Sequence, residues 1–572
     1  MTTTQEPNKY FHVSKGTFPE VMSYVSSKYE NMNALSTWQK SDTVTYSQFA
    51  SRVRSFSSFL VENGAQKGDK VAIIGLSCPN WAISFFGIQG CGCVAVPILP
   101  DFSSNEMMAI LDHSETSWVV VSSAEYSKVS SFGGNVVRMD DMLYIPSTIR
   151  QLEEFSNFLT SPGIPTTDKK IDKKIIKTLT EREPEEEDLA SIIYTSGTTG
   201  KSKGVMLTQR NLVWNADICT QPFIKISAGW RFFSILPLSH VYEFTTSLIL
   251  GLLSGAHITY IGKAPTPTAI MAALKEIKPH VMMTVPSLME KVYRRAVLPQ
   301  IKENPKISKL YNNGLTRNLV CRIVGRKLVS TFGGHILFLG IGGAPLDKEV
   351  EEFLFRAKFP YAFGYGLTET SPFIAGCGPK QHKLFTMGKV LDGLDVRLAQ
   401  DGEIQIKGPS VMKGYYKNEE LTAESFTEDG YFKTGDLGKF EGKRLAICGR
   451  SKTVILGANG ENIYPEVIEG VINNQEYVEE SLVLPDKGGL LALVKLDMVA
   501  FAKGSKEGVQ DYLKRLLANV NAQVGKNSHV REVVFQEEPL VRTPTLKIKR
   551  FLYIGKSADE KGIHVDEKPE EN

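Results

Sequence analysis

The sequence predicts an α/β fold: a large N-terminal domain of parallel and mixed sheets with flanking helices, followed by a smaller, mobile α+β domain. Three observations lead to this prediction. Apolar, strand-like runs alternate with helix-like segments from about residue 45 to 120, and the same alternation returns between about 231 and 375. Strands separated by helices indicate a parallel sheet. After Gly449 and Arg450, short strands and one amphipathic helix give the pattern of a small α+β module.

The first α/β region begins with a helix and a buried strand. Tyr46–Asn63 has apolar residues near helical spacing, and Gly64 is suited to end the helix. Val71–Leu76 is a short apolar run, as expected of a strand that is buried on both faces. The remaining elements expected here are a helix at Trp81–Gly90, a strand at Val94–Pro97, a helix at Glu106–Asp112 and a strand at Trp118–Val121.

The later part of the chain is more varied. Residues 166–188 hold a lysine cluster followed by an acidic run, which favours a solvated surface connection. Gly402–Gly408 alternates with period two, as a half-buried strand between glycine turns does. In the C-terminal module, apolar residues at helical spacing from Val509 to Val524 predict an amphipathic helix. Further strands are expected at Ser481–Leu484, Leu490–Leu496 and Glu532–Phe535, and the charged tail from Lys556 is expected to be loose.

Composition excludes several classes of protein. The 572 residues are 42% hydrophobic and 23% charged, as in ordinary globular domains, and they suffice for three or more structural units. A net charge of +3 gives no broad nucleic-acid footprint, so no nucleic-acid partner is expected. The seven cysteines contain no CxxC pair, which favours reduced thiols in a cytoplasmic protein over a zinc site. The sequence shows neither a signal-peptide pattern nor ~20 consecutive apolar residues, so no transmembrane helix is predicted.

The most informative segment runs from Tyr194 to Gly204, directly after the apolar run Leu189–Ile193. It combines three glycines, five serine or threonine hydroxyls and two lysines. Glycine lets the backbone turn its N–H groups toward an anion, hydroxyls add donors and lysines add charge. The segment fails the G-x-x-x-x-G-K-[ST] pattern of P-loop NTPases, because Thr195 occupies the position of the first glycine. A flexible linker is the alternative, but linkers rarely follow a buried strand directly. We therefore predict a phosphate-binding loop.

Four further segments accompany this loop: Ile341–Leu346, Phe363–Thr370, Tyr431–Leu437 and Gly449–Lys452. Together, and in this order, the five resemble the adenylate-forming, or AMP-binding, superfamily of acyl-CoA synthetases, nonribosomal peptide adenylation domains and luciferases. The likeness extends from about Tyr46 to Arg550. Within the superfamily, three segments look most like those of long-chain fatty acid–CoA ligases, namely Leu236–Glu243, Gly460–Glu466 and Thr543–Arg550.

The resemblance implies a ligase that works in two half-reactions. ATP-dependent activation of a fatty acid, expected to be long-chain, would give an acyl-adenylate and pyrophosphate, with Mg²⁺ on the phosphates. Transfer to coenzyme A would then give acyl-CoA and AMP. Two alternatives stay open: transfer of the acyl group to acyl carrier protein, and an inactive relative that only binds acyl chains or nucleotide. The sequence also leaves the chain-length preference and the oligomeric state open.

The resemblance assigns the phosphate side of the site residue by residue. Seven residues would hold the β- and γ-phosphates: Thr195, Ser196, Gly197, Thr198, Thr199, Gly200 and Lys201. Glu369 would bind Mg²⁺, Thr368 would hydrogen-bond the α-phosphate, and Lys547 would bridge the α-phosphate and the substrate carboxylate as a catalytic lysine. A surface-turn carboxylate is the alternative for Glu369. Taken alone, Lys547 reads as a charge on a solvated strand, and for this residue only the family context favours the functional interpretation.

The adenosine side is expected to come from other segments. Tyr365 would stack on adenine, although a tyrosine in this pattern also suits a core position. The other residues implied are Gly343, Ala344 and Gly366 around the base, and Asp436 and Arg450 at the ribose. A carboxylate suits the ribose hydroxyls because it only accepts hydrogen bonds when it is ionised.

The acyl and coenzyme A tunnel and the hinge complete the implied site. His240, Phe244 and Gly460 match positions that shape the tunnel. A lone histidine is more often a packed one, and Phe244 stands where tryptophan is frequent. Residues 1–451 would form the N-terminal adenylation domain for acyl chain, ATP and Mg²⁺. Residues 452–572 would form the mobile domain, which rotates about Lys452. A peripheral membrane contact through the lysines of residues 169–177 is the alternative to plain solvation there.

Overall fold

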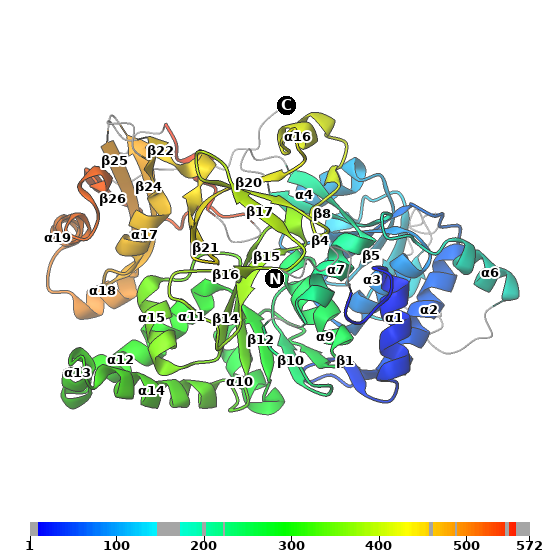
Figure 1. Ribbon diagram of the computed structural model, residues 1–572, viewed down its shortest axis with the longest axis horizontal. Helices are drawn as coiled ribbons and strands as arrows, with labels where there is room; N and C mark the ends of the chain where they lie inside the picture. Colours follow the sequence, from blue (N-terminus) through cyan, green and yellow to red (C-terminus); the bar gives the residue numbers. More distant parts are fainter. Residues whose placement is uncertain are drawn as a thin grey trace.

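A computed structural model describes residues 10–145, 172–196, 202–220, 223–456, 462–486, 489–543 and 548–555 (Figure 1). It confirms the predicted fold class, because large mixed sheets are flanked by helices and a smaller α+β region follows them. Among the described helices, none combines the length and the hydropathy that crossing a bilayer requires.

The larger sheet has 13 strands in the described residues and divides into a parallel and an antiparallel part. The parallel part contains, in spatial order, β14 (Tyr361–Gly366), β13 (Phe338–Ile341), β12 (Val281–Thr284), β10 (Arg231–Ser234), β11 (His257–Tyr260) and β1 (Asn33–Thr37), with β2 (Val44–Thr45) at its edge. The antiparallel part contains β15 (Phe373–Cys377), β16 (Gly388–Val390), β21 (Arg444–Arg450), β20 (Phe432–Glu441), β18 (Glu403–Lys407) and β17 (Asp395–Leu398). The change occurs at β14, which pairs parallel with β13 and antiparallel with β15.

The second sheet has eight strands and contains the predicted phosphate-loop region. Its order is β19 (Gly414–Tyr415), β9 (Ser202–Thr208), β8 (Leu189–Ser196), β4 (Val94–Ile98), β3 (Lys70–Ile74), β5 (Thr116–Val121), β6 (Asn135–Arg138) and β7 (Leu143–Ile145). Strands β8, β4, β3, β5 and β6 are paired in parallel, as the alternating pattern predicts.

Boundaries differ from the sequence prediction where local chemistry ends or extends an element. Helix α2 (Tyr46–Glu62) ends near Gly64, which has a φ of 93°. Strand β3 stops before Gly75, earlier than predicted. Helix α4 (Ser104–His113) begins two residues earlier than predicted, because Ser103 and Glu106 form a capping box.

The other described helices of the large region are α1 (Phe18–Lys28), α3 (Pro79–Gly90), η1 (Tyr126–Val129), α6 (Lys173–Glu181), α7 (Gln209–Ile218), α8 (Val241–Glu243), η3 (Phe244–Ile249), α9 (Leu250–Leu253), α10 (Pro267–Ile277), α11 (Pro286–Val292), η4 (Tyr293–Val297), α12 (Leu298–Lys302), α13 (Pro305–Asn312), α14 (Arg317–Thr331), α15 (Lys348–Ala357), η5 (Thr368–Thr370) and α16 (Glu419–Glu424).

One hydrophobic core joins the two large sheets. It includes Val71 and Ala95 from the eight-stranded sheet, and Leu35 and Ile258 from the 13-stranded sheet. The predicted helix at Trp81–Gly90 forms as α3 and supplies rings to this core. A stable interior of this kind holds the two sheets in a defined relation, so residues on both can contribute to one site.

The C-terminal part has hydrophobic clusters of its own. Strands β24 (Val478–Asp486), β25 (Gly489–Leu496) and β26 (Glu532–Phe535) form its sheet, as predicted from three of the segments named above. The remaining described elements are η6 (Ser451–Thr453), β22 (Ile455–Leu456), β23 (Asn462–Ile463), α17 (Pro465–Asn473), α18 (Met498–Gly504), α19 (Val509–Asn521), η7 (Lys526–Ser528) and η8 (Arg550–Leu552). Figure 1 shows this part, in orange and red, beside β21 and α15.

A buried carboxyl group lies in the core at α8. Glu243 has no exposed surface, and neither of its carboxyl oxygens has a hydrogen-bond partner of normal geometry among the described residues. Burial raises its pKa to about 8, and the nearby Ser234 and Ser247 hydroxyls only moderate that shift. Those two serines are close enough to affect the charge but are not in hydrogen-bonding geometry, so desolvation dominates. Glu243 is therefore mainly protonated at neutral pH.

This carboxyl group makes the stability depend on pH. Between its ordinary pKa of 4.5 and the raised value of about 8, the folded chain keeps a proton that the unfolded chain releases. The free energy of unfolding therefore falls as pH rises through this interval, by at most ~5 kcal/mol, and levels off above it. We expect Glu243→Gln to remove this dependence, so that the variant gains stability relative to wild type between pH 5.5 and 8.5. The melting temperatures of wild type and Glu243→Gln at the two pH values measure this gain. A difference between the two proteins that is the same at both pH values would contradict the prediction.

Candidate active site

Three residues predicted for the adenosine side come together at the junction of β14, β20 and β21. The Tyr365 hydroxyl donates to Oδ2 of Asp436 over 2.8 Å, and Nε of Arg450 lies 2.9 Å from Oδ1. The β20–β21 register places Asp436 opposite Arg450, and the strand reversal at β14 brings Tyr365 to both. Residues far apart in the sequence thus form one polar cluster.

The cluster is asymmetric in its exposure to water. The Asp436 side chain is only 4% exposed, whereas that of Arg450 is 43% exposed. Burial, followed by the Asp436 carboxylate, raises the pKa of Tyr365 well above its ordinary value, so its hydroxyl remains a donor. The result is a buried acceptor held by one neutral and one charged donor, with the guanidinium at the solvent side.

A tight turn after β14 positions Thr368 and Glu369. At its base, the backbone N–H of Leu367 donates to the carbonyl of Pro372 over 3.1 Å. The Thr370 hydroxyl donates to the same carbonyl over 2.6 Å. The carbonyl of Glu369 accepts from the N–H of Met412 over 2.8 Å. The turn is therefore held from both ends and from a neighbouring segment, and the Glu369 side chain projects from a fixed backbone.

Tyr415 is a contact of Glu369 that the sequence analysis missed. Its hydroxyl donates to Oε1 of Glu369 over 2.9 Å, and burial, followed by the carboxylate, raises the pKa of Tyr415 far above its ordinary value. It lies on β19, in none of the five motif segments, and 46 residues beyond its partner. No local pattern could have identified it.

The predicted phosphate loop is partly described. Thr195 and Ser196 form the end of β8, where they pair with Lys203 and Ser202 of β9. Gly197, Thr198, Thr199, Gly200 and Lys201 lie outside the described residues. The hairpin thus leads to and from the loop as an ordered pair of strands.

Lys203 connects the hairpin to the rest of the site. Its ammonium lies 5.3 Å from the centre of the Tyr415 ring. Desolvation and then the positive charge of Lys452 lower the pKa of Lys203, and Glu369 opposes them. The phosphate-loop hairpin, the Glu369 turn and the predicted hinge residue therefore lie within electrostatic reach of one another. Lys203 stands in the loop motif, yet the sequence assigned it no separate role.

The other residues predicted for nucleotide binding and for the hinge lie on two exposed segments or outside the described residues. Gly343 and Ala344 are exposed after β13, and Gly343 has a φ of 88°, a left-handed conformation that favours glycine. Lys452 is exposed in η6. The Ser451 hydroxyl donates to the carbonyl of Gly435 over 3.1 Å, which ties η6 to β20. Lys547 and Gly460 lie outside the described residues, and their roles stay predictions.

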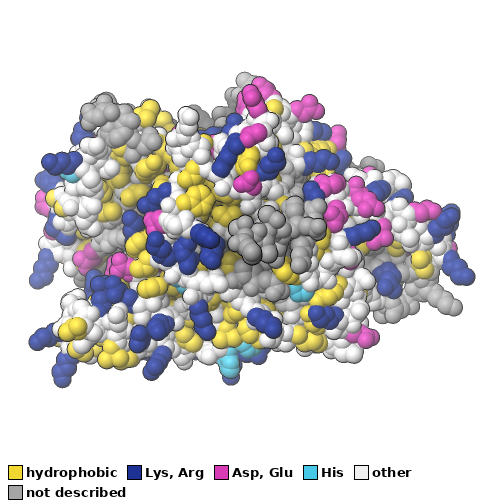
Figure 2. Space-filling view, viewed as in Figure 1, with side chains coloured by type: hydrophobic (Ala, Val, Ile, Leu, Met, Phe, Trp, Pro, Cys, Tyr) yellow, Lys and Arg dark blue, Asp and Glu magenta, His cyan; other side chains and the backbone are white. Residues whose placement is uncertain are grey.

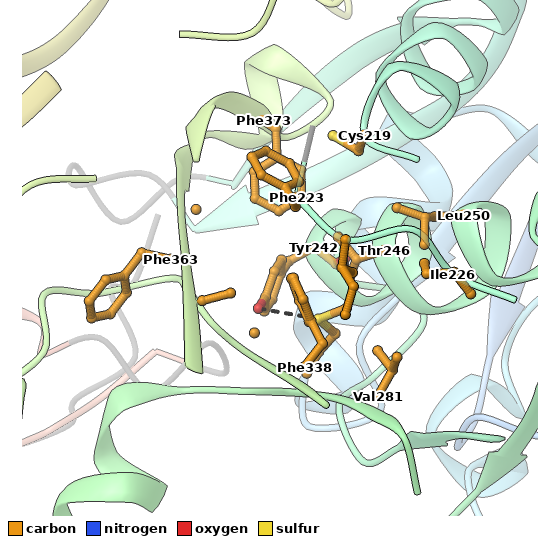
Figure 3. Close-up of a pocket in the computed structure, with 15 residues that line it drawn as sticks. Cys219, Phe223, Ile226, Tyr242, Thr246, Leu250, Val281, Phe338, Phe363 and Phe373 are labelled. Atoms are coloured by element: carbon orange, nitrogen blue, oxygen red, sulfur yellow. Dashed lines mark hydrogen bonds between the residues drawn. The ribbon is translucent and has the colours of Figure 1, made fainter. Parts of the chain in front are cut away.

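A narrow apolar cavity lies against the same part of the large sheet (Figure 3). Strands β12, β13 and β14 form one wall, and segments around α8, η3 and the end of α7 form the other. The lining residues are Cys219, Phe223, Ile224, Ile226, Tyr242, Thr246, Leu250, Val281, Met283, Phe338, Gly340, Ala362, Phe363, Gly364 and Phe373. Its volume of about 30 Å³ is room for two or three water molecules, so a longer ligand requires side chains to move.

Glycines make room for the rings that line this cavity. A Cβ on Gly364 would lie 1.9 Å from the Phe373 ring, and one on Gly340 would lie 3.1 Å from the Tyr242 hydroxyl oxygen. Figure 3 shows the Tyr242 ring reaching into the pocket between the labelled phenylalanines. The two positions explain why small residues interrupt β13 and β14.

The two described tunnel candidates are placed differently. His240 caps α8, where its Nδ1 accepts from the N–H of Tyr242 over 3.2 Å, directly before a cavity residue. Phe244 packs in the core instead, with its ring centre 4.4 Å from that of Phe85. It does not line the cavity, whereas Tyr242 and Thr246, two residues to either side, do. Helical geometry explains this, because residues two apart on a helix project to nearly opposite sides. The position of Phe244 therefore gives the tunnel role no support.

Comparison with known proteins gives a consistent set of relatives. Residues 24–416 match the family described as AMP-binding enzyme. A long-chain-fatty-acid–CoA ligase of Mycobacterium bovis is 30% identical, covering 90% of this chain and 91% of its own. A peroxisomal long chain acyl-CoA synthetase of Arabidopsis thaliana is 28% identical, covering 89% and 79%. The solved o-succinylbenzoate CoA synthetase of Bacillus subtilis, in complex with its acyl-adenylate intermediate, has a TM-score of 0.72 at 21% identity, covering 95% and 99%.

The turn that carries Glu369 depends on a glycine at position 366. A Cβ there would lie 1.7 Å from the backbone oxygen of Pro372, which no side-chain movement can relieve. We expect Gly366→Ala to destabilise the protein by about 1–3 kcal/mol, as overpacking does. Calorimetric melting measures the loss. Gly470→Ala in α17 is the matched control, since a Cβ there meets nothing within 4 Å. Equal melting temperatures for Gly366→Ala and wild type would show that this close contact does not limit the stability of the fold.

Proposed function

The chain belongs to the AMP-binding enzyme family, and on that premise we propose that it activates a long-chain fatty acid with ATP and transfers the acyl group to coenzyme A. One observation carries the proposal: β14 holds Gly364 of the apolar cavity and Tyr365 of the polar cluster as neighbours, with Glu369 in the turn that follows. An apolar chain and a nucleotide could thus meet at one strand end. Crevices at the carboxyl ends of parallel strands are the usual ligand sites of such sheets.

In the first half-reaction, a carboxylate oxygen of the fatty acid attacks the α-phosphorus of ATP. The new O–P bond replaces the bond to the β-phosphate, so pyrophosphate leaves and acyl-AMP remains. Both reactants are anions, so positioning and charge neutralisation are the main tasks of the protein. Lys201 and Lys203 of the loop segment and Lys547 would supply positive charge, and Thr368 would donate to the α-phosphate.

The residues present suit a magnesium ion. Glu369 offers a carboxylate oriented by Tyr415, and no group of three potential His, Cys, Asp or Glu ligands occurs in the described parts of the chain. This fits Mg²⁺, which is commonly held by one or two carboxylates together with substrate phosphates and water. Bound there, Mg²⁺ would neutralise phosphate charge as pyrophosphate leaves.

The adenosine moiety would lie at the polar cluster. Asp436 would accept from the ribose hydroxyls, and the half-exposed Arg450 could turn toward them as its ion pair with Asp436 is exchanged. The buried Tyr365 hydroxyl keeps the Asp436 carboxylate oriented. The adenine would lie near the backbone of Gly343 and Ala344, both exposed beside β13.

In the second half-reaction, the thiol sulfur of coenzyme A attacks the acyl carbon, and AMP leaves. We propose that residues 1–451 and 452–572 act as two domains that rearrange between the half-reactions about Lys452. Support comes from the separate hydrophobic clusters of the C-terminal part and from the position of Lys452, whose charge lowers the pKa of Lys203. Rearrangement of this kind shields a hydrolysable intermediate from water.

The substrate class is tested by an acid panel with the full-length protein. We expect acid-dependent exchange of pyrophosphate into ATP with long-chain fatty acids and little with acetate, because the cavity is lined by apolar side chains. AMP release should require both fatty acid and coenzyme A. Exclusive acylation of acyl carrier protein would contradict coenzyme A as the acceptor. AMP release only with a different class of acid would contradict a long-chain fatty acid as the substrate. Absence of exchange with every acid would indicate an inactive, binding relative.

Adjacent tyrosines provide a matched test of the metal site. Tyr415→Phe removes the hydroxyl that orients Glu369, whereas Tyr416→Phe removes a hydroxyl bound to the exposed Glu115. We expect Tyr415→Phe to raise the Mg²⁺ concentration for half-maximal pyrophosphate exchange about tenfold, as loss of an orienting hydrogen bond commonly does. Tyr416→Phe should leave it unchanged. Equal effects of the two substitutions would contradict the proposal that Glu369 binds Mg²⁺.

A further inference from the structure

Helices α13 and α14 present four aliphatic side chains to solvent at one corner of the molecule. Leu310 is 46% exposed, Leu319 61% and Ile323 59%. Leu315, in the turn between the two helices, is 93% exposed. We call this set, with the basic residues that surround it, the α13–α14 surface. Single exposed leucines are ordinary, but several exposed aliphatic side chains on consecutive elements indicate a candidate interaction site.

The exposed face of α14 mixes aliphatic and basic side chains. Leu319, Arg322, Ile323 and Arg326 follow the three- and four-residue spacing of one helical face, and all are exposed. The opposite face is buried and packs toward α15 through residues that include Leu328 and Gly325. The helix therefore already uses an inward face for the core, and the outward face carries apolar groups that the fold does not need.

The charge around these side chains is strongly positive. Residues 298–331 contain seven Lys or Arg residues and one acidic residue, Glu303. Six of the basic residues are exposed: Lys302, Lys306, Lys309, Arg322, Arg326 and Lys327. None of the six forms an ion pair with a residue that the structure describes. In Figure 2, dark-blue and yellow side chains alternate over the corner that α12, α13 and α14 occupy in Figure 1.

We propose that the α13–α14 surface docks the protein on a membrane that contains anionic lipids. The four aliphatic side chains would enter the boundary between headgroups and acyl chains, and the surrounding lysines and arginines would contact the headgroups. A lipid surface fits better than an acidic protein, because Leu315, in the turn between the helices, is 93% exposed and offers a protruding side chain rather than a pocket. Docking there goes beyond the proposed function and would bring the enzyme to the phase into which a long-chain acid partitions.

This surface differs from the lysine cluster that the sequence suggested. In the described part of that cluster, Lys173, Lys174 and Lys177 lie on α6, and Lys177 pairs with Glu181. The acidic run that follows α6 offsets the positive charge of these lysines. Figure 1 shows α6 at the opposite end of the long axis from α13. The two basic clusters therefore offer a charge-matched comparison within one chain.

The test is flotation of the full-length protein with phosphatidylcholine vesicles, with and without phosphatidylserine. Two variants change the surface: Arg322→Gln/Arg326→Gln/Lys327→Gln and Leu315→Ser/Leu319→Ser/Ile323→Ser. The matched control is Lys173→Gln/Lys174→Gln/Lys177→Gln. We expect wild type to bind the anionic vesicles in a salt-sensitive manner. The charge variant should bind on the order of a hundredfold more weakly, the control about as well as wild type, and the aliphatic variant more weakly at every salt concentration.

Each result bears on the proposal. Undiminished binding by both α14 variants would overturn it, and so would a loss confined to the α6 control. Failure of wild type to bind vesicles, with salt-sensitive binding to an acidic acyl carrier protein instead, would replace the lipid by a protein partner. All substituted side chains are exposed, and circular dichroism melting verifies that the variants fold. The vesicle readout does not involve catalysis, so its outcome is independent of the proposed function.

Discussion

The hydrogen bond from Tyr365 to Asp436 is the contact on which the candidate site depends. It joins residues 71 positions apart and ties β14, the last strand of the parallel part, to the β20–β21 pair. Asp436 is nearly buried, so losing this donor would leave a charged oxygen poorly satisfied, which costs more than an average hydrogen bond contributes. Through Asp436, the contact also orients Arg450, two residues before Lys452. The same Asp436 contacts therefore stabilise both the polar half of the site and the strand that leads into the C-terminal part.

Strand β14 also separates the two chemistries that the proposed reaction must combine. Gly364 leaves space beside the cavity, and the neighbouring Tyr365 meets the carboxylate of Asp436. The turn after Gly366 then presents Glu369 beside Tyr415 and within reach of the Lys203 charge. In the proposed reaction, an apolar chain and a polyphosphate would thus be kept in different environments until their reacting ends meet at one edge.

Helix faces explain both the placement of a predicted tunnel residue and an unexpected surface. Phe244 was predicted to shape the tunnel and directly follows the motif Leu236–Glu243. The residues of this segment that line the cavity are instead Tyr242, Thr246 and Leu250, four apart on one face. Phe244 faces the other way and packs against Phe85. In α14, periodicity shows two faces with apolar members, and only the position of α15 reveals which of them is covered. A sequence pattern defines faces, whereas packing selects the one that remains exposed.

Much of the architecture follows from local sequence. Alternating apolar runs predicted the parallel strands, glycine and hydroxyl composition predicted a loop after β8, and motif order implied that Asp436, Arg450 and Tyr365 serve one site. The predicted roles of those residues remain proposals, but the structure brings the three side chains into contact. Tyr415 and the surroundings of Lys203 could not be predicted, because they arise from contacts between segments with no local pattern in common. Local propensities and periodicity are properties of short stretches of chain, and they decided the elements. Which residues meet at the carboxylates of Asp436 and Glu369 depends on how the sheets close around a shared core, which is a property of the whole fold.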